Sequence, residues 1–189
     1  MMKSQDVVVL LKLASLEDYA KDIGDESTPL GLAAGEDPYS VRGLEAALGI
    51  SKTEIGASLK RSIAAGLAIK DRKTDRPKPS RRHLREFIVH GVKFVFPAKP
   101  GAMQRGLPTA FAAPVLRESL HSAGNLICVW PYAHAKEMGQ SVDPLFKSVP
   151  EACEKDRRLY AYLALIDAIR VGNQRESKLA ADLLVQRLG

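Results

Sequence analysis

The sequence predicts an α+β fold, in which helices are joined by a few short strands. Three observations predict it: apolar residues recur at helical spacing, Ser and Gly residues stand where helices would begin and end, and short apolar or alternating stretches fit strands. The 189 residues are 46% apolar and 26% charged, a composition typical of folded globular proteins. We expect two domains, residues 1–90 and residues 91–189.

The chain begins with a helix expected over residues 4–16. Ser4 is its predicted cap, and apolar residues at helical spacing predict one buried face. Residues 17–38 then contain several glycines, two prolines and many acidic side chains. This composition predicts a long acidic connection without regular structure.

Two further helices follow, with signals at their ends that agree. Residues 40–48 predict a helix that begins at a Ser cap and is ended by Gly49 in the left-handed conformation. Ser51 and Glu54 predict a capping box that opens the next helix, which closes at Gly66. Two helices joined by a turn that contains Gly form a helix-turn-helix. Its inward side chains are expected to be Val41, Leu44 and Leu48 in one helix and Ile55, Leu59 and Ile63 in the other.

After this motif the helical spacing stops. Residues 67–70 predict a short strand, and residues 71–80 form a charged loop with two prolines. The loop can return as a second strand or lead directly into the next helix, which is expected over residues 81–90.

This order of elements resembles the winged helix-turn-helix proteins, especially the MarR-like bacterial transcription regulators. The resemblance covers about residues 4–80 and is carried by Tyr39-Ser-Val-Arg-Gly-Leu-Glu-Ala-Ala-Leu-Gly-Ile-Ser51 and Leu59-Lys-Arg-Ser-Ile-Ala-Ala-Gly-Leu67. It implies a winged-helix domain that binds double-stranded DNA, with the second helix of the motif in the major groove and the wing on the backbone. Winged helices also mediate protein contacts.

The positive charge of the chain is concentrated in the same region. The formal net charge is +6, but residues 1–50 carry −5, residues 51–85 carry +8 and residues 86–189 carry +3. Local basicity of this kind is expected of a surface that meets phosphates, although a solvated Lys-rich face has the same composition.

The resemblance implies which residues would contact DNA. Ser51, Lys52 and Thr53 begin the reading helix, and Ser58, Lys60 and Arg61 lie further along it, the last two on an expected exposed flank. The wing and its continuation supply Lys70, Arg72, Lys73, Arg76, Lys78, Arg81 and Arg82.

One departure from the family concerns the middle of the reading helix, where similar regulators carry polar or Arg side chains. Here the residues are Gly56 and Ala57, neither of which can make a bidentate base contact. The sequence therefore supports backbone binding better than base reading, unless the small residues allow a closer approach to the bases.

The second half is expected to be a smaller α+β region that serves dimerisation or sensing. Strands are predicted over residues 92–96 and 125–131, with 139–146 as a possible partner, and residues 97–114 predict a Pro/Gly-rich loop without regular structure. That loop could bind an anionic ligand or, as we favour, pack over the strand. Three segments of the second half, Lys93-Phe-Val-Phe-Pro97, Arg105-Gly-Leu-Pro-Thr109 and Pro144-Leu-Phe-Lys-Ser-Val-Pro150, resemble only uncharacterised bacterial winged-helix proteins.

The chain is expected to end in two helices, over residues 156–171 and 174–188. Their apolar faces fit an internal core or a dimer seam. The MarR-like resemblance favours a homodimer, because those regulators dimerise through helices outside the reading motif.

Nothing in the sequence predicts an enzyme. It contains no nucleotide-binding, zinc-protease or nucleophile-elbow motif, and its four His residues are scattered. We therefore expect no catalytic residue, no metal and no cofactor. Cys128 and Cys153 are too few for a disulfide framework, and no apolar run approaches the length of a membrane span, so a cytoplasmic location is expected.

Two functions remain open. The first is a cytoplasmic bacterial transcription regulator that binds DNA. The second is a protein-interaction module, such as an antitoxin-like partner of a toxin enzyme, which would use the acidic residues 17–38 or the C-terminal helices.

Overall fold

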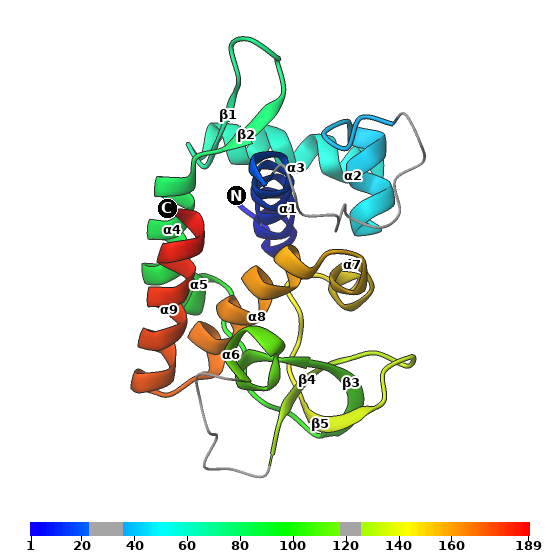
Figure 1. Ribbon diagram of the computed structural model, residues 1–189, viewed down its shortest axis with the longest axis vertical. Helices are drawn as coiled ribbons and strands as arrows, with labels where there is room; N and C mark the ends of the chain where they lie inside the picture. The colour runs from blue at the N-terminus through cyan, green and yellow to red at the C-terminus, as the bar shows by residue number, and fades with distance from the viewer. Residues whose placement is uncertain (23–35, 118–125) are drawn as a thin grey trace. The chain divides into compact units, whose positions relative to one another are not determined.

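The computed structural model describes residues 1–22, 36–117 and 126–189, and its architecture is α+β, as predicted (Figure 1). The chain divides into two compact units, of which the first contains residues 1–84 and 145–160 and the second residues 85–144 and 161–189. The first unit thus includes a segment that the sequence-based division placed in the second domain.

The first unit is mostly helical and contains one two-stranded sheet. Its elements are α1 (Ser4–Lys21), α2 (Val41–Leu48), α3 (Lys52–Ala64), β1 (Ala68–Lys70), β2 (Pro77–Pro79), the start of α4 (Arg81–His90), α7 (Val149–Lys155) and the start of α8 (Arg157–Val171). Helix α1 contacts α2, α3 and β2, and α2 also contacts α7. Strands β1 and β2 pair antiparallel, with Ile69 opposite Lys78.

Helix α1 is buried on every side over much of its length. All of the residues Asp6–Leu16 are buried, so the expectation of a single buried face was wrong. The cap is Lys3 rather than Ser4, and the helix continues to Lys21. The prediction took the polar residues of this helix to mark an exposed face. It failed because these polar side chains have partners inside the unit. Of the predicted acidic connection, the first five residues belong to α1, and residues 23–35 lie outside the part described.

Two of those polar side chains meet a carboxylate from a distant part of the chain. The Lys12 ammonium donates to Asp156 at 2.7 Å, and the two side chains are only 4% and 1% exposed. The Ser15 hydroxyl also donates to Asp156 at 2.8 Å. The same carboxylate caps α8, because it accepts the backbone N–H groups of Arg158 and Leu159 at 3.0 and 2.9 Å. Asp156 therefore joins α1 to the start of α8.

The helix-turn-helix elements match their predicted bounds closely. Leu44, Leu48 and Ile55 are buried, as expected, and Leu59 is partly exposed. Val41 and Ile63, which were also expected to face inward, are 37% and 38% exposed. They lie near the start of α2 and the end of α3, where helical spacing predicts the buried face least well.

The second unit combines helices with a small barrel. Its elements are the rest of α4, α5 (Val92–Val95), β3 (Met103–Thr109), the 3₁₀ helix η1 (Ala110–Ala112), α6 (Pro114–Arg117), β4 (Cys128–Pro131), β5 (Glu137–Ser141), the rest of α8 and α9 (Gln174–Leu188). Strand β3 pairs antiparallel with both β4 and β5, which pair parallel with each other, so the three strands close.

Two predictions for this unit were wrong. Residues 92–95 form helix α5 instead of a strand, because Gly91 keeps a right-handed backbone and the Phe96 N–H donates to the Val92 carbonyl at 2.9 Å. The Pro/Gly-rich segment contains strand β3, Met103–Thr109, which includes Gly106 and Pro108. At Gly106 the backbone approaches Trp130 too closely for any side chain.

The remaining elements of this unit were located well. Strand β4 falls within the predicted strand, whereas its partner β5 begins before the predicted 139–146 segment. Helices α8 and α9 match the predicted C-terminal helices, and Asn173 caps α9 in a capping box with Glu176. Leu163, Ile166 and Ile169 of α8 are buried within the single chain, which is the internal core that the sequence allowed.

A second buried carboxylate, Asp167, lies at the core of this unit. It accepts hydrogen bonds from the Thr109 hydroxyl at 2.9 Å, the Trp130 indole N–H at 2.5 Å and the Arg170 guanidinium at 2.7 Å. Arg170 in turn donates to the carbonyls of Phe96 and Asp143. Burial raises the pKa of Asp167, and the Arg170 charge opposes that rise.

Candidate nucleic-acid interface

The turn between α2 and α3 exposes the first residues of α3. The Ser40 hydroxyl caps α2 by accepting the Gly43 N–H, and Gly49 ends the helix with φ of 63°. The Ser51 hydroxyl then accepts the Glu54 N–H. Ser51, Lys52 and Thr53 are exposed, and the Lys52 N–H donates to the Glu45 carboxylate at 3.2 Å. Lys52 is 53% exposed and lies 3.7 Å from Glu45.

The capping box predicted for α3 is only half formed. Ser51 makes its bond, but the Glu54 carboxylate accepts from the Arg61 guanidinium at 2.6 Å and from the Lys3 ammonium at 3.1 Å. Glu54 therefore connects α3 to the N-terminal segment of the chain.

Arg61 was predicted to lie on an exposed flank, and that prediction was wrong. Its guanidinium donates to both carboxylate oxygens of Asp6, at 2.9 and 2.6 Å, and its side chain is 21% exposed. Burial alone would raise the pKa of Asp6, but hydrogen bonds from Arg61 and the Lys3 backbone hold it below its ordinary value. Arg61 thus fastens α3 to α1 and is not available to a phosphate. Ser58 is fully buried, so it cannot contact a base either.

The predicted wing is an ordered hairpin, β1–β2. The Asp71 N–H donates to the Arg76 carbonyl at 2.9 Å, which closes the loop. The Asp71 carboxylate accepts the N–H groups of Lys73 and Thr74 and the Thr74 hydroxyl, and these hydrogen bonds lower its pKa. Asp75 takes the left-handed conformation, with φ of 53°. The Asp-x-x-Thr spacing of Asp71 and Thr74 is a sequence signal for this turn.

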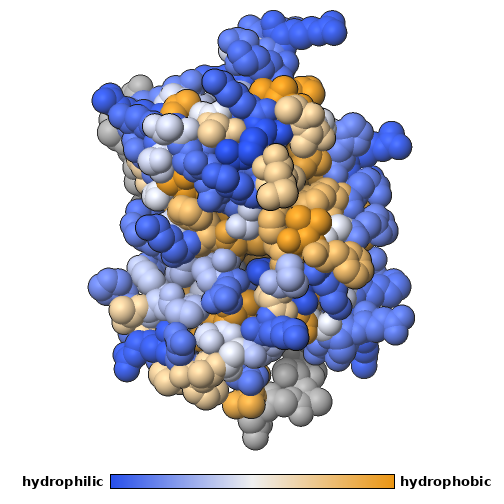
Figure 2. Space-filling model, turned by 180° about the vertical axis from the view of Figure 1, so that it is seen from behind, coloured by the Kyte–Doolittle hydropathy of each residue, from blue (hydrophilic) through white to orange (hydrophobic). Residues whose placement is uncertain are grey.

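The hairpin places its cations in different environments. Within the described residues, Arg72 and Lys73 have no ion-pair partner, and both are exposed. Lys70 lies 3.5 Å from Asp75, and Lys78 lies 4.0 Å from Glu17. The hairpin is at the top of the view in Figure 1, and its projecting tip in Figure 2 consists of hydrophilic side chains. The two cations without partners are therefore the best placed to meet an anionic surface.

Two contacts hold the Arg76 side chain, and neither could be predicted from the sequence. Its guanidinium lies 3.3 Å from the Asp37 carboxylate and 4.9 Å from the centre of the Tyr39 ring. It remains 47% exposed. Arg76 can contact a phosphate from a fixed position, because its stem is already ordered.

Arg81 was predicted as a DNA contact, but its side chain faces inward. It donates to Glu17 at 2.9 Å, to Asp18 at 2.7 Å and to the Ala14 carbonyl at 3.0 Å, and it is 14% exposed. Its role is to fasten the start of α4 to α1. Arg82, by contrast, is exposed, as is Lys60 of α3.

Gly56 offers a test of the middle of α3. A Cβ atom placed on it would meet no atom within 4 Å. We expect Gly56→Ala to raise the free energy of unfolding by about 1 kcal/mol, because alanine loses less backbone entropy in a helix. Urea denaturation followed by circular dichroism measures this. A loss of stability would show that Gly56 is needed for packing.

The described part of the chain contains neither a candidate metal site nor a helix that could span a membrane. In residues 1–22, 36–117 and 126–189, no group of three or more His, Cys, Asp or Glu side chains is arranged to hold a metal ion. No helix in that part of the chain combines the length and apolar character that crossing a bilayer requires.

Comparisons with known proteins give no relative for this chain. No family model matches it, and neither does any curated protein or solved structure. The function is therefore argued from the residues and their geometry.

Proposed function

We propose that this protein is a DNA-binding transcription regulator whose first unit contacts double-stranded DNA. The proposal is carried by an exposed, capped start of α3 together with a hairpin whose tip holds two cations, Arg72 and Lys73, that have no ion-pair partner among the described residues. Exposed cations on an ordered element suit a phosphate backbone, because binding need not break an existing ion pair.

The division of roles follows from exposure. Ser51, Lys52 and Thr53 approach the bases and the nearest phosphates from the start of α3, with Lys60 further along it. The hairpin contacts the backbone through Lys70, Arg72, Lys73, Arg76 and Lys78, and Arg82 extends this contact onto α4. Phosphate contacts fix the position of the protein on the duplex, whereas base contacts provide sequence selection.

Sequence selection by this surface is expected to be modest. Gly56 and Ala57 occupy the middle of α3 and cannot form bidentate hydrogen bonds, and the buried Ser58 contributes nothing. Selection then depends on Lys52 and Thr53 and on the shape of the DNA. If the small residues serve close approach, Gly56→Ala should weaken DNA binding while it stabilises the fold.

The proposal includes a cytoplasmic location in a bacterium and a homodimeric state. Both rest on the resemblance to MarR-like regulators carried by residues 39–51 and 59–67. The apolar face of α8 gives no separate support for a dimer, since its side chains are buried within one chain.

The test compares two double variants that each remove two positive charges. We expect Arg72→Gln with Lys73→Gln to weaken binding to a fluorescent duplex about tenfold at low salt, because two phosphate contacts are lost. The matched control, Lys147→Gln with Arg157→Gln, changes two exposed residues of the first unit outside α3 and the hairpin. Fluorescence anisotropy measures both. Absence of binding by the unaltered protein, or equal weakening in the two variants, would refute the proposal.

A further inference from the structure

The turn before α2, residues 37–40, carries two side chains that contact the hairpin. Asp37 and Tyr39 both reach Arg76, the residue directly before β2. The Asp37 carboxylate lies 3.3 Å from the Arg76 guanidinium, whose central carbon lies 4.9 Å from the centre of the Tyr39 ring. All three residues belong to the first unit, so these contacts lie within one compact body.

The turn is fixed to the start of α2. The Ser40 N–H donates to the Asp37 carbonyl at 3.0 Å, and the Tyr39 N–H donates to the Asp37 carboxylate at 3.1 Å. The Ser40 hydroxyl in turn caps α2. Gly43 of α2 lies so close to the turn that a Cβ atom on it would be 2.6 Å from the Asp37 carbonyl oxygen. The turn therefore forms one ordered piece with α2.

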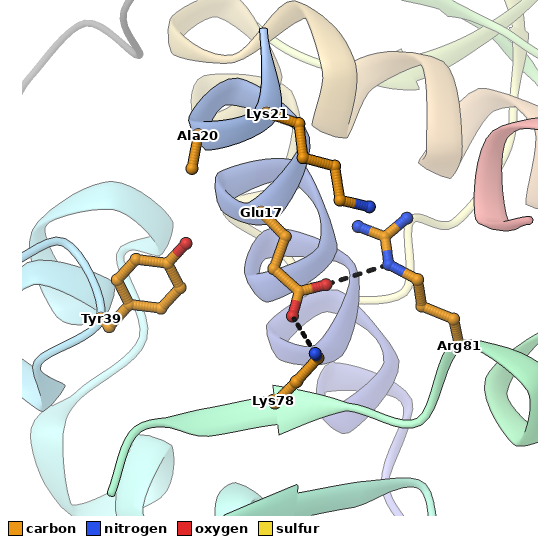
Figure 3. A pocket seen from close by; sticks show the side chains of 6 residues that line it. All are labelled: Glu17, Ala20, Lys21, Tyr39, Lys78 and Arg81. Atoms are coloured by element: carbon orange, nitrogen blue, oxygen red, sulfur yellow. Dashed lines mark hydrogen bonds and ion pairs between the residues drawn. The ribbon is translucent and has the colours of Figure 1, made fainter. Parts of the chain in front are cut away.

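The hairpin side of the contact is ordered as well. The Arg76 carbonyl accepts the Asp71 N–H at 2.9 Å. At the base of the hairpin, Lys78 lies 4.0 Å from Glu17 of α1, which also accepts from Arg81 at 2.9 Å (Figure 3). Arg76 thus joins an ordered hairpin to the turn that begins the helix-turn-helix.

The two contacts affect Arg76 in opposite ways when a phosphate approaches. The Tyr39 ring attracts the guanidinium through its face and takes up none of its N–H donors, which stay free for phosphate oxygens. The Asp37 carboxylate competes for those donors, and its negative charge repels a phosphate. The side chains of Arg76 and Asp37 are 47% and 43% exposed, so DNA can reach both. The ring therefore favours a phosphate contact, whereas the carboxylate opposes it.

We propose that Asp37 and Tyr39 set the strength of the Arg76 contact with DNA. Tyr39 is a positioning residue that holds the guanidinium, and Asp37 is a competing anion that lowers the affinity. The inference rests on the proposed function. Neither residue is among the DNA contacts that the resemblance implies, and both act from the element that leads into the reading helix.

Substitutions at the two positions separate these roles when the full chain is titrated against a fluorescent duplex at low salt and anisotropy is measured. Asp37→Asn removes the charge but keeps an oxygen for the Tyr39 N–H, and it should tighten binding about threefold. Tyr39→Leu removes the ring and should weaken binding about threefold, whereas Tyr39→Phe keeps the ring and should bind like the unaltered protein. Glu151→Gln, which removes an exposed, ion-paired carboxylate elsewhere in the unit, should leave the affinity unchanged.

Arg76→Gln tests whether both effects pass through the guanidinium. In this background, Asp37→Asn and Tyr39→Leu should cause no further change in affinity, because the group on which they act is gone. Circular dichroism checks that each variant is folded. If Tyr39→Leu does not fold, the cycle of Asp37→Asn with Arg76→Gln decides the outcome.

The outcomes distinguish this inference from the proposed function. If Asp37→Asn tightens binding equally with and without Arg76, its charge acts on DNA from a distance and the inference is overturned. It is also overturned if Tyr39→Phe weakens binding as much as Tyr39→Leu, or if Asp37→Asn and Tyr39→Leu both bind like an unaltered protein that does bind DNA. Absence of binding by the unaltered protein would overturn the proposed function and this inference with it.

Discussion

Asp156→Ala is expected to lower the free energy of unfolding by about 3–5 kcal/mol. The substitution leaves the Lys12 ammonium, which is 4% exposed, without its counter-charge. It also removes the acceptor of the Ser15 hydroxyl and of two N–H groups at the start of α8. Such a loss is a large share of the stability of a typical domain. Urea denaturation followed by circular dichroism measures it.

A double variant that removes both charges tests whether the unpaired Lys12 charge causes this loss of stability. Asp156→Ala with Lys12→Met should be more stable than Asp156→Ala alone, because methionine fills the buried space without an unpaired charge. If the double variant is less stable than the single one, or if Asp156→Ala costs under about 1 kcal/mol, the buried ion pair does not have the role assigned to it.

Asp167→Ala is expected to produce a loss of similar size in the second unit, again about 3–5 kcal/mol. It leaves the Arg170 guanidinium, which is 4% exposed, without its carboxylate, and it removes the acceptor of the Thr109 hydroxyl and of the Trp130 indole. Trp130 is the single tryptophan of the chain, so its fluorescence follows the unfolding of this site directly.

The control for Asp167 is an exposed aspartate of the same unit. Asp182→Ala removes an ion pair with Lys178, in which the side chains are 58% and 77% exposed, and it should cost under about 1 kcal/mol. Equal effects of Asp167→Ala and Asp182→Ala on the fluorescence transition would show that burial does not decide the cost.

The elements with local signals were predicted well from the sequence. The bounds of α2, α3, α4, α8 and α9 could be found because caps, glycines and helical spacing act over a few residues. The positions of strand β3 and helix α5 could not be found in this way. The residues of β3 pair with residues 19 to 37 positions further along the chain, and Gly91 can either end a helix or continue one. Local spacing does not distinguish these cases.

The candidate site was predicted in part. We could predict that four cations are exposed, because they are charged residues of a loop and a helix that face solvent: Lys52, Lys60, Arg72 and Lys73. The inward roles of Arg61 and Arg81 depend on carboxylates 55 to 64 positions earlier in the chain. No local pattern reveals such partners, so a cation that binds phosphate and one that fastens two helices look alike in sequence.

The salt dependence of DNA affinity tests the central claim most directly. For the unaltered protein, the logarithm of the association constant should fall linearly with the logarithm of salt concentration, with a slope of about −0.9 for each phosphate contacted. Arg72→Gln with Lys73→Gln should make that slope shallower by about 1.8, whereas Lys147→Gln with Arg157→Gln should leave it unchanged. A slope that is the same for all three proteins would contradict the account, as would the absence of binding at low salt.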